Sequence, residues 1–393
     1  MRVAVIGAGI TGITTAYSLA KRGIDVTVFD ECHYPGMKTS YANGGQLSVS
    51  NSDVWTTIPN LIKGMKWMFK KDAPLLINPT PSWSKYRWIS KFMLEAFKGN
   101  ANENTIATAQ MGLHARWLYN RIAEEEKIDF DLRKTGILHF YKNKEYFESA
   151  KRSCDEVYSR ICEPRHILTT DQLLNIEPSL QYASGIIGGT YTPGDMTGDI
   201  HKFCVELSLV LRDKYNVKFV YDYNATINNV QSYDNVVLCA GVKSAEFSRL
   251  LGDPIDIYPV KGYSITVDVS ESLAAPEVSL LDDEAKIVTS CLGNRLRVAG
   301  TAELAGINYD IRMDRIDPLV KWVRTNFPFV QTEHVNPWAG LRPMTPTMLP
   351  VVRKSKADKF WYNTGHGHLG WTLSPATAEM ITDLIVADVR IDI

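Results

Sequence analysis

Long hydrophobic runs, paired cysteines and a strong charge of one sign are all missing from this sequence. No apolar stretch reaches the roughly 18 residues that a membrane-spanning helix needs. The six cysteines show neither close pairing nor metal-ligand spacing, which predicts reduced thiols and no metal site. The net charge of −1, with both signs spread along the chain, argues against a nucleic-acid partner. No signal peptide precedes the first predicted strand, so we expect a cytoplasmic protein.

What the sequence does have is length and an ordered N-terminal block. Its 393 residues contain no internal repeat and suffice for about two compact domains. Residues 2–6 (RVAVI) form a predicted buried strand, and the glycines of a G-x-G-x-x-G motif follow at once. A predicted helix and a second strand, 25–30 (DVTVFD), complete a dinucleotide-binding unit.

Each glycine of this motif has a mechanical reason. Gly7 makes the tight turn, Gly9 lets a pyrophosphate approach the backbone, and Gly12 lets the helix pack closely on the strand. The helix N-terminus offers free N–H groups and the positive end of its dipole to phosphates. Asp30 ends the second strand and is placed to accept hydrogen bonds from ribose hydroxyls. The motif alone leaves FAD and NAD open.

Two later segments return to the same architecture. Residues 235–238 form a predicted buried strand that ends in the small residues Ala240 and Gly241. Residues 360–364 form another, followed by the glycine-bearing loop 365–370. A nucleotide-binding domain formed by three separate segments of the chain suits FAD, which is an extended molecule. A simple NAD-binding domain is usually formed by one contiguous segment.

The remaining patterns predict a second domain and its capped helices. Residues 258–269 and 295–300 alternate like an antiparallel sheet, which is a different architecture. Asp199 is expected to cap a helix that runs to about residue 215, and Ser374 to cap the last helix with Pro375 at its first position. The predicted class is therefore α/β, with a discontinuous Rossmann-like FAD-binding domain and a substrate domain with a mixed or antiparallel sheet and helices. The expected FAD-binding segments are 1–80, 185–250 and 335–393, and the expected substrate-binding segments are 81–184 and 251–334.

An amphipathic basic segment lies at residues 55–71. Apolar residues from Ile58 to Phe69 follow helical spacing on one face, and Lys63, Lys66 and Lys70 form another. With Trp55 and Trp67 nearby, this pattern suits a membrane interface. The alternative is a helix that packs on the core or covers the active site, and the aromatic segment 83–97 allows the same two interpretations.

Taken together, these segments resemble the small-subunit type of FAD-dependent D-amino-acid dehydrogenase, within the D-amino-acid oxidase/glycine oxidase group of flavoproteins. The resemblance runs almost end to end, and its last three motifs together are specific. One departure is Gly44, where the family leads us to expect alanine. The motifs are 5–12 with Asp30, 41–46 (YANGGQ), 67–74, 194–199 (GDMTGD), 259–266 (PVKGYSIT), 340–346 (GLRPMTP) and 363–372 (NTGHGHLGWT).

The resemblance implies hydride transfer from the substrate Cα to flavin N5, giving an imino acid that hydrolyses to a 2-oxo acid and ammonia. The flavin supplies the chemistry, so no catalytic dyad of side chains is expected. Electrons are expected to pass to a quinone or a similar acceptor rather than mainly to oxygen, and the preference for D-amino acids depends on the resemblance alone. Two alternatives stay open: an enzyme that oxidises glycine, sarcosine or proline-like secondary amines, and a non-catalytic electron-transfer subunit.

The resemblance also assigns roles to individual residues. Arg342 matches the position that binds the substrate carboxylate, which a planar guanidinium grips bidentately. Tyr263 is either a second carboxylate ligand or a half-buried sheet tyrosine. His366 and His368 either orient the amine and contact the flavin ring or are merely structural, and Asp195 either faces the amine or caps a turn.

A larger set is expected to contact FAD through small residues and backbone groups of four loops. The loop after residue 364 is expected to bring N–H groups and a helix N-terminus towards flavin N1 and C2=O, which stabilises the anionic reduced flavin. The set comprises Gly7, Gly9, Gly12, Asp30, Ser40, Asn43, Gly44, Gly45, Gln46, Ala240, Gly241, Gly365, His366, Gly367, Leu369, Gly370 and Trp371.

Overall fold

The first of two sheets is assembled from three separated parts of the chain. The computed structural model describes residues 1–67, 74–161, 163–270 and 275–391. Five of the six strands of this sheet are parallel, and only its edge strand β16 runs antiparallel to its neighbour. The order is β16 (Val351–Lys354), β17 (Phe360–Thr364), β10 (Asn235–Leu238), β1 (Arg2–Ile6), β2 (Asp25–Phe29) and β9 (Lys218–Val220).

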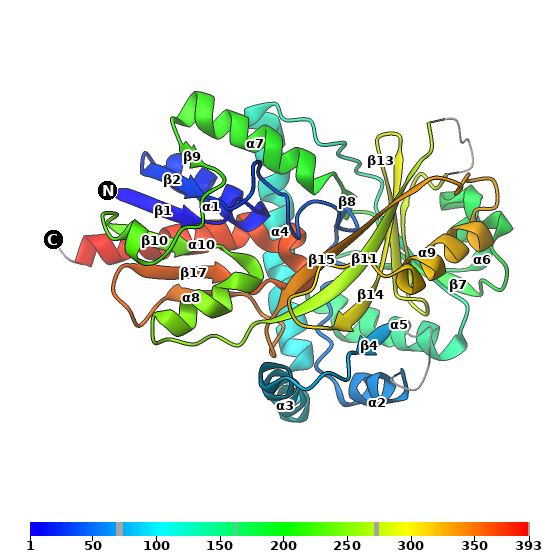
Figure 1. Cartoon of the computed structure of the whole chain (residues 1–393). Coiled ribbons are helices and arrows are strands. Elements are labelled where there is room, and N and C mark those ends of the chain that lie inside the picture. Colours follow the sequence, from blue (N-terminus) through cyan, green and yellow to red (C-terminus); the bar gives the residue numbers. More distant parts are fainter. Residues whose placement is uncertain (68–73, 162, 271–274, 392–393) are drawn as a thin grey trace.

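Helices cover both faces of this sheet, which explains why its central strands are apolar without interruption. The helices α1 (Ile10–Ala20), α7 (Ile200–Tyr215) and α10 (Gly370–Ile391) share a core with Val3, Val5 and their neighbours on one face. Helix α8 (Ser244–Leu250) packs on the opposite face. In Figure 1 both chain termini lie at this sheet, and α4 (Ala101–Glu126) runs through the middle of the molecule.

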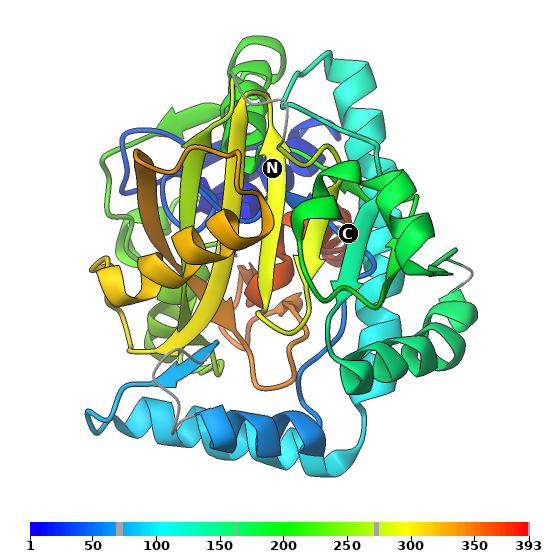
Figure 2. The same cartoon turned by 90° about the vertical axis from the view of Figure 1, so that its right-hand side faces the viewer.

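The second sheet has nine strands and lies on the other side of α4 in Figure 1. Its faces differ, because alternate residues of a strand point to opposite sides. Tyr263, Ile265 and Val267 pack in a core with α9 (Met313–Asn326), which crosses the sheet in Figure 2. The order is β15 (Val335–Met344), β11 (Tyr258–Asp268), β14 (Arg295–Leu304), β13 (Ile287–Leu292), β12 (Ser279–Asp282), β5 (Ile137–Tyr141), β7 (Gly188–Thr192) and β6 (His166–Leu168), with β4 (Leu75–Ile77) beside β14.

The remaining elements lie around these sheets. In Figure 2, α2 and α3 lie together along the lower edge of the molecule, below the strands. The elements are the two-stranded pair β3 (Gln46–Leu47) and β8 (Met196–Thr197), the helices α2 (Ile58–Trp67), α3 (Trp83–Lys98), α5 (Lys144–Glu156) and α6 (Thr170–Ile176), and the 3₁₀ turns Tyr158–Ile161, Pro178–Tyr182, Asn228–Val230, Gly241–Lys243 and Gly367–Leu369.

The predicted fold class is confirmed. The domain boundaries stay a prediction, and three strands pair outside the sheet of the domain to which they were assigned. Strands β4, β7 and β15 come from segments that the sequence assigned to the FAD-binding domain, yet all three pair within the nine-stranded sheet. The reason is clearest at β15, which forms an antiparallel ladder with β11 from Tyr258↔Met344 to Val267↔Val335. Pairing partners this distant leave no local signal in the sequence.

The start of the last helix also differs from the prediction. Helix α10 begins at Gly370, and Pro375 lies inside it rather than at its first position. Because proline has no N–H, the carbonyl of Trp371 one turn earlier lacks its helical donor. The hydroxyl of Tyr119 on α4 donates to that carbonyl instead, at 2.5 Å. A side chain from another helix therefore lets α10 start a turn earlier, directly after the glycine loop.

Two expected absences can be examined over the described ranges. Within them, no helix combines the length and the apolar character needed to cross a bilayer. Cys32, Cys154, Cys204, Cys239 and Cys291 are free thiols there.

Candidate active site

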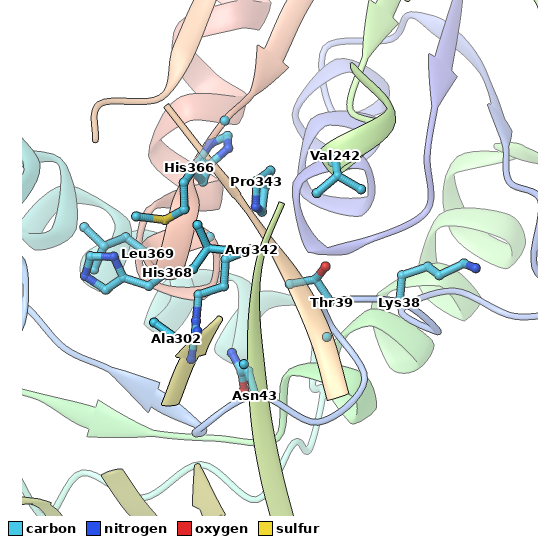
Figure 3. Close-up of a pocket in the computed structure, with 18 of the residues that line it drawn as sticks. Lys38, Thr39, Asn43, Val242, Ala302, Arg342, Pro343, His366, His368 and Leu369 are labelled. Carbon is cyan, nitrogen blue, oxygen red and sulfur yellow. The ribbon is translucent and has the colours of Figure 1, made fainter. Parts of the chain in front are cut away.

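A cavity of about 1130 Å³ lies between the two sheets and is lined by residues of both. Sites for single small molecules typically enclose 300–1,000 Å³, so this cavity is large enough for a cofactor together with a substrate. The glycine turns after β1, β10 and β17 line it from the six-stranded sheet, and β11 to β15 supply the facing wall. Figure 3 shows part of this lining.

The first glycine turn is shaped by backbone contacts that tolerate no side chain. Gly7 has a φ of 108°, and a Cβ there would lie 2.5 Å from the carbonyl oxygen of Cys239. A Cβ on Gly12 would lie 1.8 Å from the carbonyl oxygen of Gly7, so the close packing of α1 on β1 requires glycine. Gly9 is the N-cap of α1, with open space around its Cβ position except for Ser40 Oγ at 3.4 Å. The mechanical reasons predicted for Gly7 and Gly12 are thus confirmed.

The acid at the end of β2 lies beside this turn. Asp30 Oδ2 accepts from the N–H of Ala8 at 2.6 Å, and its Oδ1 accepts from the N–H of Cys32 at 2.8 Å. Ser40 Oγ accepts from the N–H of Ile10 at 3.1 Å. The N–H groups of the following residues in the first turn of α1 have no intrahelical acceptor, and Thr11 lines the cavity. These donors form a ready anion site at the helix N-terminus.

The loop at residues 42–46 is tied down by side chains of the nine-stranded sheet. Its three successive carbonyls at 42–44 accept from Ser264 Oγ (2.8 Å), Arg297 Nη1 (3.1 Å) and Ser290 Oγ (2.8 Å), in that order. Gln46 is buried, and its side-chain oxygen has no hydrogen-bond partner within the described ranges. The loop is therefore a fixed part of the cavity wall rather than an ordinary surface turn.

The glycine at position 44 has a steric explanation here. A Cβ on Gly44 would lie 2.5 Å from Cγ2 of Val288 on β13. Glycine therefore compensates for a bulky residue on the facing sheet, which accounts for the departure from the alanine that the resemblance leads one to expect.

The last loop turns directly into α10. Gly365 and Gly367 both have positive φ, and Cβ atoms there would meet Thr345 at 2.8 Å and Met344 at 2.6 Å. His366 is buried, and its Nε2 lies 2.8 Å from Thr377 Oγ1 on α10. Burial lowers the pKa of His366 to about 3, so its ring is neutral and holds the loop against the helix. This contact favours the structural alternative for His366.

Arg342 lies on the cavity wall that the nine-stranded sheet supplies, where its guanidinium crosses strand β11. The side chain passes over Gly262, at which a Cβ would lie 2.5 Å from Cζ. Nη1 donates to the carbonyl of Thr301 at 3.0 Å, and no carboxylate of the described residues contributes to the pKa of Arg342. Burial lowers the pKa of Arg342 to about 10. Because a guanidinium has five N–H donors, this part-buried cation retains donors for an anion from outside the chain.

His368 lies next to Arg342, as Figure 3 shows. Its ring stacks on Trp55, with centroids 4.6 Å apart and planes inclined by 22°. Burial, and then the charge of Arg342, lowers the pKa of His368 to about 3. Its Nε2 is buried and finds no hydrogen-bond partner in the described part of the chain. A neutral imidazole with an unused acceptor therefore lies beside a cation with unused donors.

Tyr263 is among the residues that line the cavity, but its hydroxyl already has a partner within the protein. Its neighbours on β11, Gly262 and Ser264, face the cavity, so strand alternation turns the Tyr263 side chain towards α9. Its hydroxyl donates to Glu303 at 2.6 Å, and Glu303 also pairs with Arg312. The alternative interpretation, a buried sheet tyrosine, fits this structure.

Asp195 and Trp371 also have structural positions. The buried carboxylate of Asp195 accepts from the N–H groups of Val49 (2.8 Å) and Ser50 (3.1 Å), which is the turn-capping alternative. Trp371 lines the cavity, but its ring packs against Tyr119 in the core, 4.6 Å between centroids.

All other predicted site residues except Gly12 also line the cavity. Sequence reasoning missed Trp55, Asn51 and Thr301, because a stacking ring and backbone carbonyls carry no motif. Trp55 had been grouped with the amphipathic segment. Over the described ranges no group of three or more His, Cys, Asp or Glu residues could hold a metal ion.

The chain belongs to the DAO family of FAD-dependent oxidoreductases, which it matches over residues 2–384. D-amino acid dehydrogenase 3 of Mesorhizobium japonicum is 48% identical over 411 aligned positions, covering 100% of this chain and 98% of that relative. D-amino acid dehydrogenase of Dechloromonas aromatica is 36% identical, with 98% and 97% covered.

Solved structures with the same fold include two amine-oxidising enzymes. Glycine oxidase from Geobacillus kaustophilus has a TM-score of 0.75 at 21% identity, covering 98% of this chain and 95% of that one. L-proline dehydrogenase from P. horikoshii has a TM-score of 0.75 at 16% identity, with 98% and 93% covered. At these identities the likeness establishes the fold alone.

The cofactor of this enzyme is FAD, and the residues present suit it. The Cβ-free turn at Gly7 and the free N–H groups of α1 fit a pyrophosphate, and Asp30 fits a ribose.

Proposed function

We propose that this enzyme oxidises D-amino acids to 2-oxo acids and ammonia and passes the electrons to a quinone or a similar acceptor. The single observation that carries the proposal is Arg342, a part-buried guanidinium with unused donors in the same cavity as the cofactor-binding turns. The names of the relatives, D-amino acid dehydrogenases, support the substrate class.

FAD, when bound, accepts a hydride from the substrate Cα. The chain supplies binding and orientation. Gly7, Gly9 and the α1 N-terminus hold the pyrophosphate, and Asp30 holds the ribose. The other cofactor contacts come from the loops that contain Ser40, Asn43–Gln46, Ala240–Gly241 and Gly365–Trp371.

Arg342 binds the α-carboxylate in a fork geometry and thereby fixes one end of the amino acid. The unpartnered Nε2 of His368 accepts a hydrogen bond from the amine, because the ring is neutral. Trp55 holds that ring in place by stacking. The carboxylate and the amine of the substrate are then oriented by protein side chains, and the substrate side chain packs against the cavity wall. The fourth substituent of Cα is the hydrogen that is transferred.

The proposed quinone acceptor, and contact with a membrane, are supported by the helices at the cavity margin. Leu61, Ile62 and Phe92 line the cavity from α2 and α3. Helix α3 also exposes Trp83 (81%) and Phe97 (65%). An apolar acceptor dissolved in a membrane reaches the cavity through such a margin. Of the basic residues predicted to face the lipid, Lys66 is exposed, whereas the Lys63 ammonium lies over the Tyr146 ring at 4.3 Å; Lys70 lies outside the described residues.

Sedimentation with anionic liposomes tests the membrane contact. We expect a double variant Trp83→Ser/Phe97→Ser to lose most of its liposome binding. Tyr34→Ser is the control, because Tyr34 is 65% exposed and belongs to neither helix. Equal sedimentation of the wild type and the double variant contradicts the proposal.

Anaerobic reduction of the bound flavin tests the reaction itself. D-, L- and N-methyl amino acids, glycine and proline are each added to the yellow protein, and bleaching is followed near the flavin maximum. We expect D-amino acids to bleach the flavin fastest. Bleaching by secondary amines or glycine alone identifies the alternative substrate class, and no bleaching by any of them identifies an electron-transfer subunit.

A further inference from the structure

The cavity does not end at Arg342 but continues along the facing sheet to the turn between β12 and β13. Its lining passes from Thr301 on β14 to Val288 on β13 and Leu281 on β12, and then reaches Asp283 and Lys286. The last two residues are the ends of the turn at residues 283–286, which joins β12 to β13. A charged pair thus lies at the end of an otherwise apolar stretch of the cavity wall.

This charged pair and Arg342 line the same cavity, and the strands between them show which face of the sheet that is. Val288 pairs with Ala299, and both side chains lie beside the Cβ position of Gly44 on the cavity face. Lys286 lies two residues before Val288, and Thr301, whose carbonyl accepts from Arg342, lies two residues after Ala299. Lys286 and Arg342 therefore line the same cavity, one from the β12–β13 turn and the other from β15.

Lys286 has N–H donors that are not used within the protein, whereas both carboxylate oxygens of Asp283 have neighbouring groups. Lys286 Nζ contacts Asp283 Oδ1 at 3.0 Å, and the other oxygen of Asp283 lies 3.2 Å from His139 Nδ1. An ammonium has three N–H donors, so Lys286 retains two for a ligand. Lys63 of α2 adds a second positive charge, because both ammonium groups approach the ring of Tyr146, at 4.3 Å for Lys63 and 5.8 Å for Lys286.

The other charged groups near the β12–β13 turn do not reverse the preference of this part of the cavity for an anion. Arg165 adds a further positive charge, with Nη2 3.1 Å from His139 Nδ1, and burial lowers the pKa of His139. Burial raises the pKa of Asp53, while the positive charges of Arg165 and Lys286 act in the opposite direction. Glu145 is exposed to solvent, where screening reduces its effect. A cationic substrate side chain would meet lysines and an already paired carboxylate, whereas a carboxylate would meet free donors.

We propose that Lys286 determines specificity by binding the distal carboxylate of an acidic D-amino acid whose α-carboxylate is held by Arg342. The inference rests on the proposed function and deepens it, since it names the class of side chain that the site takes. Val288 and Leu281 provide the apolar wall along which the intervening methylene groups lie.

The steady-state test compares D-glutamate with D-glutamine, which has the same shape without the charge. We expect the wild type to favour D-glutamate in kcat/KM by about tenfold or more, since unpaired polar groups penalise the wrong ligand. Lys286→Gln is expected to remove that preference and to leave kcat/KM for D-alanine within about twofold. Lys286→Arg retains most of the preference, and the control Lys66→Gln, which changes an exposed lysine of α2 outside the lining, behaves as the wild type.

A binding measurement tests the subsite without turnover. Glutarate and butyrate are titrated into the flavin-loaded protein, and the perturbation of the flavin spectrum gives the two dissociation constants. We expect glutarate to bind about tenfold more tightly in the wild type and equally in Lys286→Gln. Equal binding of the two acids by the wild type, or equal losses for every substrate in Lys286→Gln, overturns the assignment of Lys286. If no D-amino acid reduces the flavin, the proposed function fails, and the comparison of glutarate with butyrate still decides the subsite.

Discussion

The two ends of the cavity are built by different means. The cofactor end is made of backbone: short turns with positive φ, helix N-termini and glycines that neighbouring carbonyls approach closely. The substrate end is made of side chains that project from the nine-stranded sheet, above all Arg342. A site made of backbone tolerates almost no added atom, whereas a site made of side chains can change its specificity while the fold persists.

The largest effect is expected when a single methyl group is added at Gly12, at the cofactor end of the cavity. Gly12→Ala places a Cβ 1.8 Å from the Gly7 carbonyl oxygen, so α1 must move away from β1. We expect a loss of about 3 kcal/mol or more in stability and little bound flavin. The measurement is the flavin-to-protein ratio together with Tm. Gly64→Ala is the control, because this helical glycine of α2 has only Leu75 near its Cβ position, at 3.4 Å, and should keep full flavin.

The next effect tests the substrate end. Arg342→Ala removes the guanidinium from a cavity that offers the substrate carboxylate no other arginine so placed among the described residues. We expect KM for D-amino acids to rise about 100-fold, equivalent to about 3 kcal/mol, with flavin content unchanged. Arg312→Ala serves as the control, because Arg312 pairs with Glu303 and Asp314 on the other face of the sheet. A wild-type KM in Arg342→Ala would show that the carboxylate is bound elsewhere.

A smaller effect is expected at Gly262, over which the Arg342 side chain passes. In Gly262→Ala the new Cβ lies 2.5 Å from the Arg342 guanidinium, which must shift because it is the movable partner. We expect KM to rise about tenfold with normal folding and flavin content. The double variant Gly262→Ala/Arg342→Ala should be no worse than Arg342→Ala alone, since both changes act through one group. Additive effects would separate Gly262 from Arg342.

The last effect is negligible at neutral pH and grows only as the pH falls; it concerns His366 in the loop before α10. The folded-state pKa of His366 is about 3, below the value of about 6.5 in an unfolded chain, so below pH 6.5 the unfolded state binds the extra proton. Stability from this residue is complete above pH 6.5 and falls by about 1.4 kcal/mol per pH unit as the pH decreases towards 3. His366→Gln should flatten the slope by that amount. Urea unfolding at pH 7, 6 and 5 with fixed flavin measures it, and parallel curves for both proteins contradict the expectation.

The cofactor end was predictable because its requirements are local. Gly7 and Gly12 must be glycines for reasons that involve a strand, a turn and a helix adjacent in sequence. The same locality explains why both strands of the βαβ unit were placed to within one residue, and why the cap at Asp199 was found.

The substrate end was only partly predictable. Its geometry depends on which face of the sheet each residue occupies and on pairing between strands that are far apart in the sequence. Tyr263 belongs to a recognisable motif, yet which face it occupies depends on the register with β14, where a bulge lies between Lys261 and Tyr263. Lys286 carries no motif at all. Its position in the cavity follows from the pairing of β12 and β13 with their neighbours, which no short stretch of sequence specifies.

The order of strands in the six-stranded sheet has a consequence for biosynthesis. Strand β1 pairs with β10, and β10 pairs with β17. This side of the sheet therefore cannot form until residues 235–238 and then residues 360–364 have been synthesised. At roughly 5–20 residues per second, the ribosome needs tens of seconds to supply that last strand. During this interval the nascent chain exposes an unpaired apolar strand edge, and the flavin can be captured only after synthesis is nearly complete.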